Sequence, residues 1–184
     1  MEIFKNQYPV FATVFFVVVI LLAHLLSPSS YEWSRNTISD LGAQGYSKNF
    51  VMRIGLVGFG GLLVAGVLVN GPAPRTSLIL LYGAAILVTG VFCAKPFLPS
   101  AEWSTREHQL HSLFAQIAGV AFILAMLVST FTSPSNGERW IHVLFVLLVS
   151  ICSGLFMFWT DRQGIAQRLL YLVSFIWLTR FYKP

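Results

Sequence analysis

The polar segment of residues 31–43 carries residue types that can do chemistry, in a chain that is otherwise strongly apolar. It contains Ser39 directly before Asp40, together with Asn36 and Trp33. A carboxylate can act as a general base or bind a metal ion, and a hydroxyl can stabilise an oxyanion. We therefore predict a catalytic role for Asp40 and Ser39. The alternative is structural, because short polar side chains also satisfy backbone groups through caps and turns in a loop at membrane depth.

Three of the four histidines could join this segment. His108 and His111 share one face of a predicted helix, and His24 ends the preceding apolar run on the same side. With Asp40, these imidazoles could form an open tetrahedral zinc site that activates a water. We predict His24, His108 and His111 as metal ligands. Two alternatives remain: a hydrogen-bonded structural role for His111, or a b-type haem held between His24 and His111.

Arg168 stands near the start of the last apolar run. A guanidinium binds carboxylate or phosphate oxygens through paired hydrogen bonds. We predict that Arg168 pairs with Asp40 or binds a lipid phosphate, with Asn36 and Trp33 as further substrate-contacting residues. The alternative is an ordinary cation whose aliphatic stem lies along apolar surface while its charge reaches the headgroups.

The composition shows which kind of protein must position these residues. Of 184 residues, 56% are hydrophobic and 10% are charged, whereas a soluble domain carries about 25% charged residues. The chain lacks the polar residues to cover itself in water, so its solvent must be partly lipid. The net charge of +5 is spread along the chain, which argues against nucleic acid as a partner and leaves membrane lipids.

Six apolar runs have about the length that crosses a bilayer. We predict an all-α fold, a polytopic integral membrane bundle of six transmembrane helices in a single domain, residues 1–184. An even number of helices places both termini on the same side. The predicted helices are residues 8–26, 50–69, 77–94, 108–131, 140–159 and 166–182.

The connections after the first, third and fifth helices are longer than the others and carry most of the acidic groups. They hold five of the seven Asp and Glu residues. Because these connections lie on one side of the predicted bundle, we expect the site there. In the fourth helix, Ala115 and Gly119 continue the face of His111, so we expect His111 to point into the bundle. The distribution of Lys and Arg does not decide the orientation.

The segment YEWSRNTISDLGA, residues 31–43, resembles the signature of the six-helix membrane family catalogued as domain of unknown function 998. Phe97 and Pro99, His111 just inside the fourth helix, and the run GIAQR at 164–168 are also similar to that family. The resemblance implies the six-helix fold. It marks four positions as the ones of interest: Ser39, Asp40, His111 and Arg168.

The core Ile-Ser-Asp-x-Gly of that segment is also distantly similar to the DRAM/FRAG/SFK membrane proteins. That resemblance implies a link to autophagy and to the handling of lipids or GPI anchors. It assigns no reaction, so the enzymatic and non-enzymatic hypotheses for the loop both stay open.

Two functions follow with equal weight. The first is a metal-dependent lipid hydrolase, in which Asp40 and the histidines hold the ion and Arg168 binds a headgroup. The second is a non-enzymatic lipid-handling, transport or sensory protein that uses the same polar cluster. A third is an accessory subunit whose loop only ties the helices together. We expect the protein in a prokaryotic cell (inner) membrane.

Overall fold

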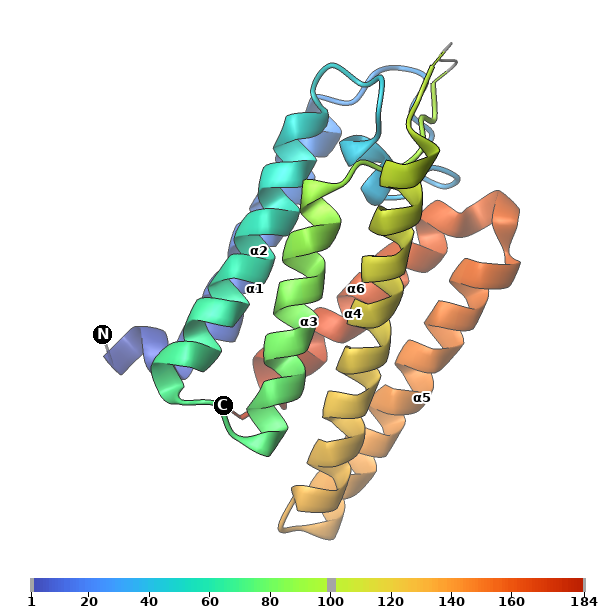
Figure 1. Cartoon of the computed structure of the whole chain (residues 1–184). Helices are drawn as coiled ribbons and strands as arrows, with labels where there is room; N and C mark the ends of the chain where they lie inside the picture. The colour runs from blue at the N-terminus through green and yellow to red at the C-terminus, as the bar shows by residue number, and fades with distance from the viewer. Residues whose placement is uncertain (1, 99–101, 184) are drawn as a thin grey trace.

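The computed structural model describes residues 2–98 and 102–183, which leaves Pro99 outside the described residues. The described ranges contain six α-helices, two short 3-10 helices and no strand (Figure 1). In chain order these are α1 (Glu2–Leu25), η1 (Ser39–Gly42), α2 (Asn49–Asn70), α3 (Pro74–Val91), α4 (Thr105–Thr132), α5 (Asn136–Phe158), η2 (Thr160–Arg162) and α6 (Gln163–Arg180). The all-α prediction is confirmed.

Helix α1 begins at Glu2, earlier than the start predicted at residue 8, although Pro9 lies inside it. Proline has no backbone N–H, so the carbonyl of Lys5 loses its usual donor four residues on. Asn70, the last residue of α2, replaces that donor, with its Nδ2 atom 2.9 Å from the Lys5 carbonyl oxygen. Because this hydrogen bond satisfies the carbonyl, α1 can extend toward the N-terminus. The bond also connects α1 to the end of α2.

The helices differ in how well they suit a bilayer. Within the described residues, α1, α2, α4 and α5 are long and apolar enough to cross a membrane, and α3 contributes a shorter apolar stretch, Thr76–Val91. The sixth helix does not reach the same level of apolarity, since Gln163, Gln167 and Arg168 occupy its first turns. The six predicted helices are therefore all present, and four of them are long and apolar enough to cross a membrane.

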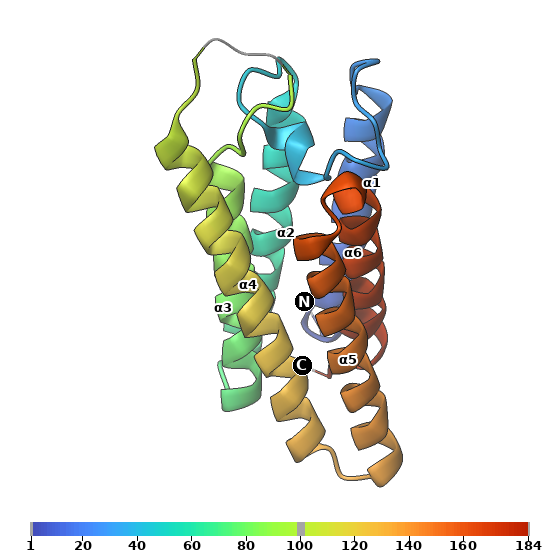
Figure 2. The same ribbon diagram turned by 90° about the vertical axis from the view of Figure 1, so that its right-hand side faces the viewer.

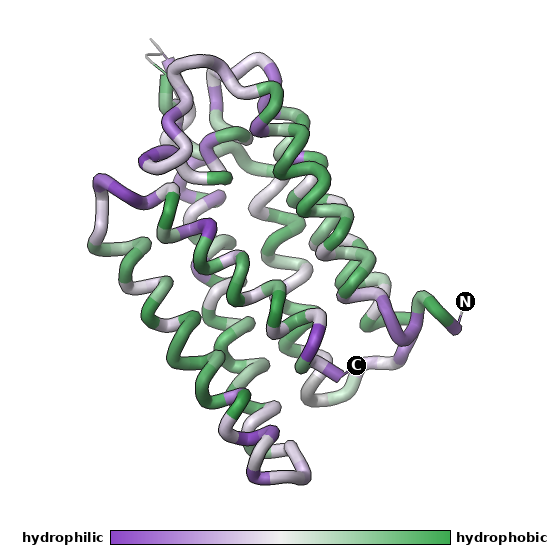
Figure 3. Tube along the Cα trace, turned by 180° about the vertical axis from the view of Figure 1, so that it is seen from behind, coloured by the Kyte–Doolittle hydropathy of each residue, from purple (hydrophilic) through white to green (hydrophobic). Residues whose placement is uncertain are grey.

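Most residues along the helices are hydrophobic (Figure 3), and many large apolar side chains are exposed on the outside of the bundle. Large side chains such as Phe131 and Phe158 are 80% and 81% exposed. An apolar surface this extensive would be unfavourable against water, and in a soluble protein it would mark an interface. It suits lipid as the surrounding solvent.

Successive helices pack against one another, and α6 closes the arrangement against α1. The connections α1–α2, α3–α4 and α5–α6 gather at one end of the bundle, which we call the loop end (Figures 1 and 2). The two chain termini lie near each other, away from these loops. The structure thus collects the polar loops in one place, because successive helices alternate in direction.

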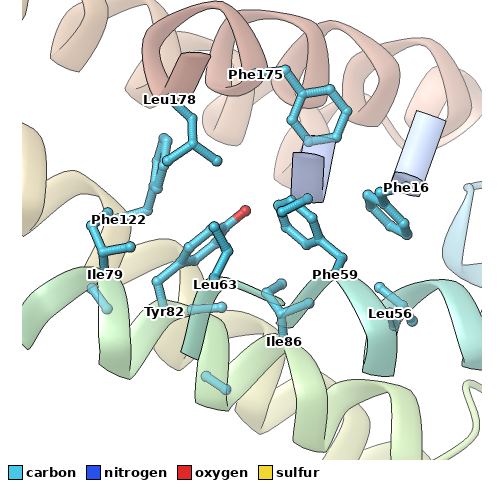
Figure 4. Close-up of a cluster of buried hydrophobic side chains, with 14 of the residues drawn as sticks. Phe16, Leu56, Phe59, Leu63, Ile79, Tyr82, Ile86, Phe122, Phe175 and Leu178 are labelled. Carbon is cyan, nitrogen blue, oxygen red and sulfur yellow. The ribbon is translucent and has the colours of Figure 1, made fainter. Parts of the chain in front are cut away.

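Aromatic side chains from five helices meet in the core (Figure 4). Phe16 of α1 stacks on Phe59 of α2 with ring centroids 4.8 Å apart. Tyr82 of α3 lies 4.8 Å from Phe122 of α4, which packs edge-on against Trp177 of α6 at 5.2 Å. Such pairs stabilise beyond the area that they bury. This core fixes the helices whose loop-end turns carry the candidate site.

Away from the loop end, two buried hydrogen bonds join elements that are distant in sequence. Trp177 donates from Nε1 to Nδ1 of His142, in α5, over 2.9 Å. The hydroxyls of Tyr8 and Tyr182 are 2.8 Å apart. His142 is therefore a packing partner of the core and belongs to a different part of the molecule from the other three histidines.

Candidate functional site

The loop after α1 is stabilised from within by Asp40. Thr37 donates its backbone N–H to Oδ2 of Asp40 at 2.8 Å, and the backbone N–H of Asp40 donates to Oγ1 of Thr37 at 3.1 Å. This reciprocal pair has the pattern of a capping box, one residue before Ile38, the N-cap of η1. Burial raises the pKa of the Asp40 carboxyl above its usual range, and the hydrogen bonds from Thr37 and Asn36 only partly offset that effect. The carboxyl of Asp40 therefore holds its own loop together.

Gln167 joins this loop to α6. Its Oε1 accepts the backbone N–H of Ile38 at 2.6 Å, and its Nε2 donates to Oγ of Ser39 at 3.2 Å. One amide side chain thus satisfies two polar groups of the loop at once. The Ser39 hydroxyl, predicted to steady an oxyanion, is held by this amide.

Arg168, the next residue, binds four neutral acceptors. Its Nη1 donates to the carbonyl oxygens of Asn36 at 3.0 Å and Gly164 at 2.8 Å. Its Nη2 donates to Nε2 of His24 at 2.6 Å and to the hydroxyl of Tyr31 at 2.7 Å. These contacts occupy all four Nη hydrogens. We call the set Tyr31, Gln167, Arg168 and His24 the α6 lock.

The predicted ion pair between Arg168 and Asp40 is not formed. Across the part of the chain that the structure describes, the ion pairs involve Arg35 and Lys183 only. The capping box turns the Asp40 carboxyl toward the backbone of Thr37. Arg168 therefore has a positive charge and no carboxylate partner among residues 2–98 and 102–183.

Tyr31 links Arg168 to the loop backbone. Its hydroxyl accepts from Arg168 and donates to the carbonyl of Thr37 at 2.8 Å. Burial raises the pKa of Tyr31 to about 12, although the neighbouring Arg168 acts in the opposite direction. The phenol therefore keeps its proton at neutral pH and serves as a donor. The guanidinium carbon of Arg168 lies 6.0 Å from the ring centroids of Tyr31 and Trp33, at the outer limit of a cation–π contact.

The hydrogen bonds of His24 define its tautomer. Its Nδ1 is 2.7 Å from the carbonyl oxygen of Ile20, which can only accept, so Nδ1 carries the proton. Its Nε2 faces Arg168, which can only donate, so Nε2 accepts. His24 is therefore neutral and both of its ring nitrogens are in use.

The loop also completes the first turn of α6. The N–H groups of Gly164 and Ile165 donate to the carbonyls of Arg35 and Ser34 at 3.1 and 3.2 Å. These are donors that have no partner inside their own helix. A Cβ atom on Gly164 would collide with the carbonyl oxygens of Trp33 and Asn36, so only glycine allows this approach. The packing explains the glycine that opens the run GIAQR.

The side chains of Asn36 and Trp33, predicted to contact a substrate, have different surroundings. Asn36 accepts the backbone N–H of Glu32 through Oδ1 at 2.9 Å, and its Nδ2 is 3.5 Å from Oδ2 of Asp40. Its amide is therefore used within the loop. Trp33 is 60% exposed at the loop end, and its ring remains available to an external partner.

A second cluster satisfies the end of α3. Nδ1 of His111 is 3.0 Å from the carbonyl oxygens of both Thr89 and Phe92, so this nitrogen carries a proton that the two acceptors share. Arg53 of α2 donates from Nε to Gly90 at 3.2 Å and from Nη2 to Val91 at 2.8 Å. We call His111 and Arg53 with these four carbonyls the α3 cap.

Two neighbours of His111 extend the α3 cap to the start of the following loop. Glu107 accepts the N–H of Cys93 at 3.2 Å, and Nδ1 of His108 accepts that of Lys95 at 3.2 Å. The polar side chains in the first turns of α4 are thus used to hold the chain that precedes it.

The donor set for a metal is not assembled. Within residues 2–98 and 102–183, no three His, Cys, Asp or Glu side chains come close enough to hold an ion. His24 has no unused ring nitrogen, while His108 and His111 bind the chain around the end of α3. The residues therefore do not fit the predicted zinc site, and His24 does not fit an axial haem ligand.

Several residues that organise the loop end were missed by the sequence prediction. Thr37 was detectable, since its spacing of three before Asp40 is that of a capping box. Gln167 lies beside Arg168 in the family signature but carries no charge to attract notice. Arg53 binds the backbone of α3, 37 residues away, and the hydroxyl of Tyr31 accepts from Arg168, 137 residues away; no local pattern indicates either contact.

The fold and the loop-end network define a class of protein before any relative is considered. The bundle has several apolar helices and exposed apolar side chains, and side chains of the protein satisfy the backbone groups of its polar loops. These features indicate a multi-pass integral membrane protein. The chain belongs to the family described as "Protein of unknown function (DUF998)", which matches residues 10–181. No curated protein and no solved structure gives a match. The more distant resemblance to the DRAM/FRAG/SFK proteins stays a prediction.

Proposed function

We propose that this protein spans the membrane six times, with both termini on one side, and binds an anionic lipid headgroup at its loop end without altering it chemically. One observation carries the proposal: the charge of Arg168 is compensated by neutral groups alone. The location of the protein in a prokaryotic inner membrane stays a prediction.

The electrostatics of the α6 lock favour an anion. Arg168 is half-buried, and its partners are two carbonyls, a phenol and a neutral imidazole. The nearby acid Asp40 directs its carboxyl to Thr37 and Asn36 and forms no ion pair with Arg168. A cation in a poorly solvated site is costly unless an opposite charge approaches. A lipid phosphate at headgroup depth would supply that charge.

Exposed aromatic rings surround the approach to this charge. Trp33 and Trp159 lie in the loops beside the start of α6, with their rings largely accessible. Tryptophan prefers the headgroup region of a bilayer. The tryptophans would place the α6 lock at the depth of the lipid phosphates, where the field of Arg168 acts over a short distance.

The geometry gives less support to a hydrolase. Ser39 and Asp40 are both engaged in holding the loop, and the histidines do not gather around an open position. A hydrolytic site needs a nucleophile or an activated water beside an oxyanion stabiliser. The α6 lock instead offers a fixed charge, and the exposed Trp33 and Trp159 lie beside it, an arrangement that suits binding.

Native mass spectrometry of the purified protein tests the proposal. The protein would be equilibrated with equal amounts of phosphatidylglycerol and phosphatidylcholine, and the retained lipids counted. We expect several-fold more phosphatidylglycerol on the wild type. Trp33→Ala, at an exposed position, and Arg168→Gln should both reduce that preference, whereas Arg180→Gln, a matched change at the other end of α6, should not.

The melting temperature of each variant separates binding from folding. Because Arg168→Gln also removes hydrogen bonds, the exposed Trp33→Ala variant provides the cleaner comparison. Equal retention of the two lipids by the wild type, or an unchanged preference in a folded Trp33→Ala protein, would refute the proposal.

A further inference from the structure

A second cationic position lies on the outer surface of the bundle, away from the α6 lock. A groove of about 410 Å³ runs between α1 and α2, next to the last turn of α3. Its wall is formed mainly by Phe15 of α1 and by Ile54 and Val57 of α2, with Arg53 among the lining residues. The volume falls within the range of roughly 300–1,000 Å³ found for small-molecule sites.

The absence of a side chain at Gly58 lets the ring of Phe15 pack closely against α2 in the wall of the groove. A Cβ atom at position 58 would press against the ring of Phe15. Ile54, one turn closer to the loop end, is 58% exposed. The lining below Arg53 is therefore apolar and faces outward, where a multi-pass membrane protein meets lipid.

Arg53 lies at the polar end of this groove, one turn inside the start of α2. Its Nε and Nη2 atoms donate to the carbonyls of Gly90 and Val91. Its Nη1 makes no hydrogen bond within the described residues, and no carboxylate there forms an ion pair with it. Both N–H groups of Nη1 and the second N–H of Nη2 have no partner among the described residues, whereas the four Nη hydrogens of Arg168 are all used.

We propose that this groove holds an acyl chain of an anionic phospholipid whose phosphate is bound by Nη1 of Arg53. The match has two parts. The apolar lining accepts hydrocarbon, and the one cation lies at the loop end, where the headgroups lie in the membrane arrangement proposed above. The inference relies on that arrangement but not on lipid binding by the α6 lock.

Charge favours a lipid over a helix of a second copy. A partner helix would have to bring an acidic group to Arg53 at the edge of the hydrocarbon, where a buried charge is costly. A phospholipid carries its phosphate at that depth already. The two carbonyls of α3 fix the guanidinium plane, so that Nη1 is oriented before the lipid arrives.

Photo-crosslinking in vesicles tests this site directly. The wild-type protein would be reconstituted with phosphatidylglycerol that carries a diazirine on its acyl chain, in a phosphatidylcholine background, and the labelled peptides identified. We expect strong labelling around Phe15 and Ile54, compared with Leu147 and Ile151 on the exposed face of α5 as a measure of ordinary surrounding lipid. The same label on phosphatidylcholine should mark the groove several-fold less.

Three variants separate the two parts of the match. Arg53→Gln keeps a donor for the α3 carbonyls but removes the charge, and it should lower groove labelling by phosphatidylglycerol to the phosphatidylcholine level. Arg53→Lys should retain most of the labelling. Ile54→Trp, at a lipid-exposed position, should reduce labelling by both lipids while the melting temperature stays close to that of the wild type.

The possible outcomes decide between the two proposals. Equal labelling of the groove and the α5 face, or a preference that survives Arg53→Gln in folded protein, would overturn the groove site. A groove without lipid adducts, together with a dimer in native mass spectrometry, would indicate that a second copy covers it and would overturn the lipid site. None of these results depends on Trp33→Ala, which tests the α6 lock.

Discussion

The α6 lock and the α3 cap both satisfy backbone groups at the loop end, but they connect different parts of the chain. Arg168 and Gln167 reach residues about 130 positions away or more, such as Ile38 and His24. The α3 cap joins helices that follow one another in the chain. Arg53 binds a carbonyl 37 residues away, and His111 binds one 22 residues away. The lock closes the bundle between its first and last helices, whereas the cap completes one helix end.

This difference has an energetic consequence. Contacts between α1 and α6 are sparse compared with those between successive helices. Joining distant segments costs chain entropy before any contact compensates. The α6 lock supplies strong polar contacts where apolar packing is limited, so its loss should affect the fold more than loss of the α3 cap.

Arg168→Ala should have the largest effect. It would leave the Tyr31 hydroxyl, His24 Nε2 and two carbonyls without their donor. We expect the free energy of unfolding to fall by roughly 2 to 3 kcal/mol, because several partly buried acceptors lose a charged donor. Unfolding in SDS–detergent mixtures would measure it, with Arg180→Ala as the control. A loss no larger than the control's would show that the lock does not stabilise the bundle.

His111→Ala should have an intermediate effect. It removes one N–H that is shared by Thr89 and Phe92, and these carbonyls lie at a helix end. We expect a loss of about 1 to 2 kcal/mol, with partial recovery in His111→Gln, whose amide can donate. The same unfolding assay applies. A loss equal to that of Arg168→Ala would remove the distinction between lock and cap.

Asp40→Asn should have the smallest effect, and its sign depends on pH. Burial raises the folded-state pKa above the ordinary value of 3.8, so the folded protein binds the proton more tightly. The wild type should therefore lose stability as pH rises from 3.8 through the folded pKa. Asparagine keeps an acceptor for Thr37 and does not titrate, so the variant should lack this decline and be at least as stable at neutral pH.

Melting curves from pH 4 to 8 would show this behaviour. A wild type that gains stability over the window, relative to Asp40→Asn, would mean that the ionised carboxylate stabilises the loop. That result would reopen the pairing of Asp40 with Arg168.

The position of His111 shows how a correct prediction can rest on a wrong reason. The small residues Ala115 and Gly119 suggested that this face of α4 packs into the bundle. His111 is indeed 6% exposed, but Ala115 and Gly119 are exposed, and a Cβ on Gly119 would meet nothing. Small residues permit close helix packing without requiring it, and the hydrogen bonds to α3 are what hold His111 inside.

The candidate site illustrates the same limit. The types and neighbourhood of Asp40, Ser39 and Arg168 marked the correct loop and the correct end of α6. Their roles did not follow, because a capping carboxylate and a catalytic one have the same sequence. Only the contacts with Thr37 and Gln167 distinguish the two, and these depend on the path of the loop.

The sequence by itself determined the helices, the apolar surface and the side on which the polar loops gather, because periodicity, length and helix parity are local or countable properties. The tertiary structure decided that Arg168 binds His24 and Tyr31, that Arg53 keeps an open donor, and that the histidines do not converge. The physical reason is that helix rotation and the order of helices around the bundle arise from packing between distant segments. A shift of one residue along a helix turns a side chain by about 100°, which is enough to change its partner.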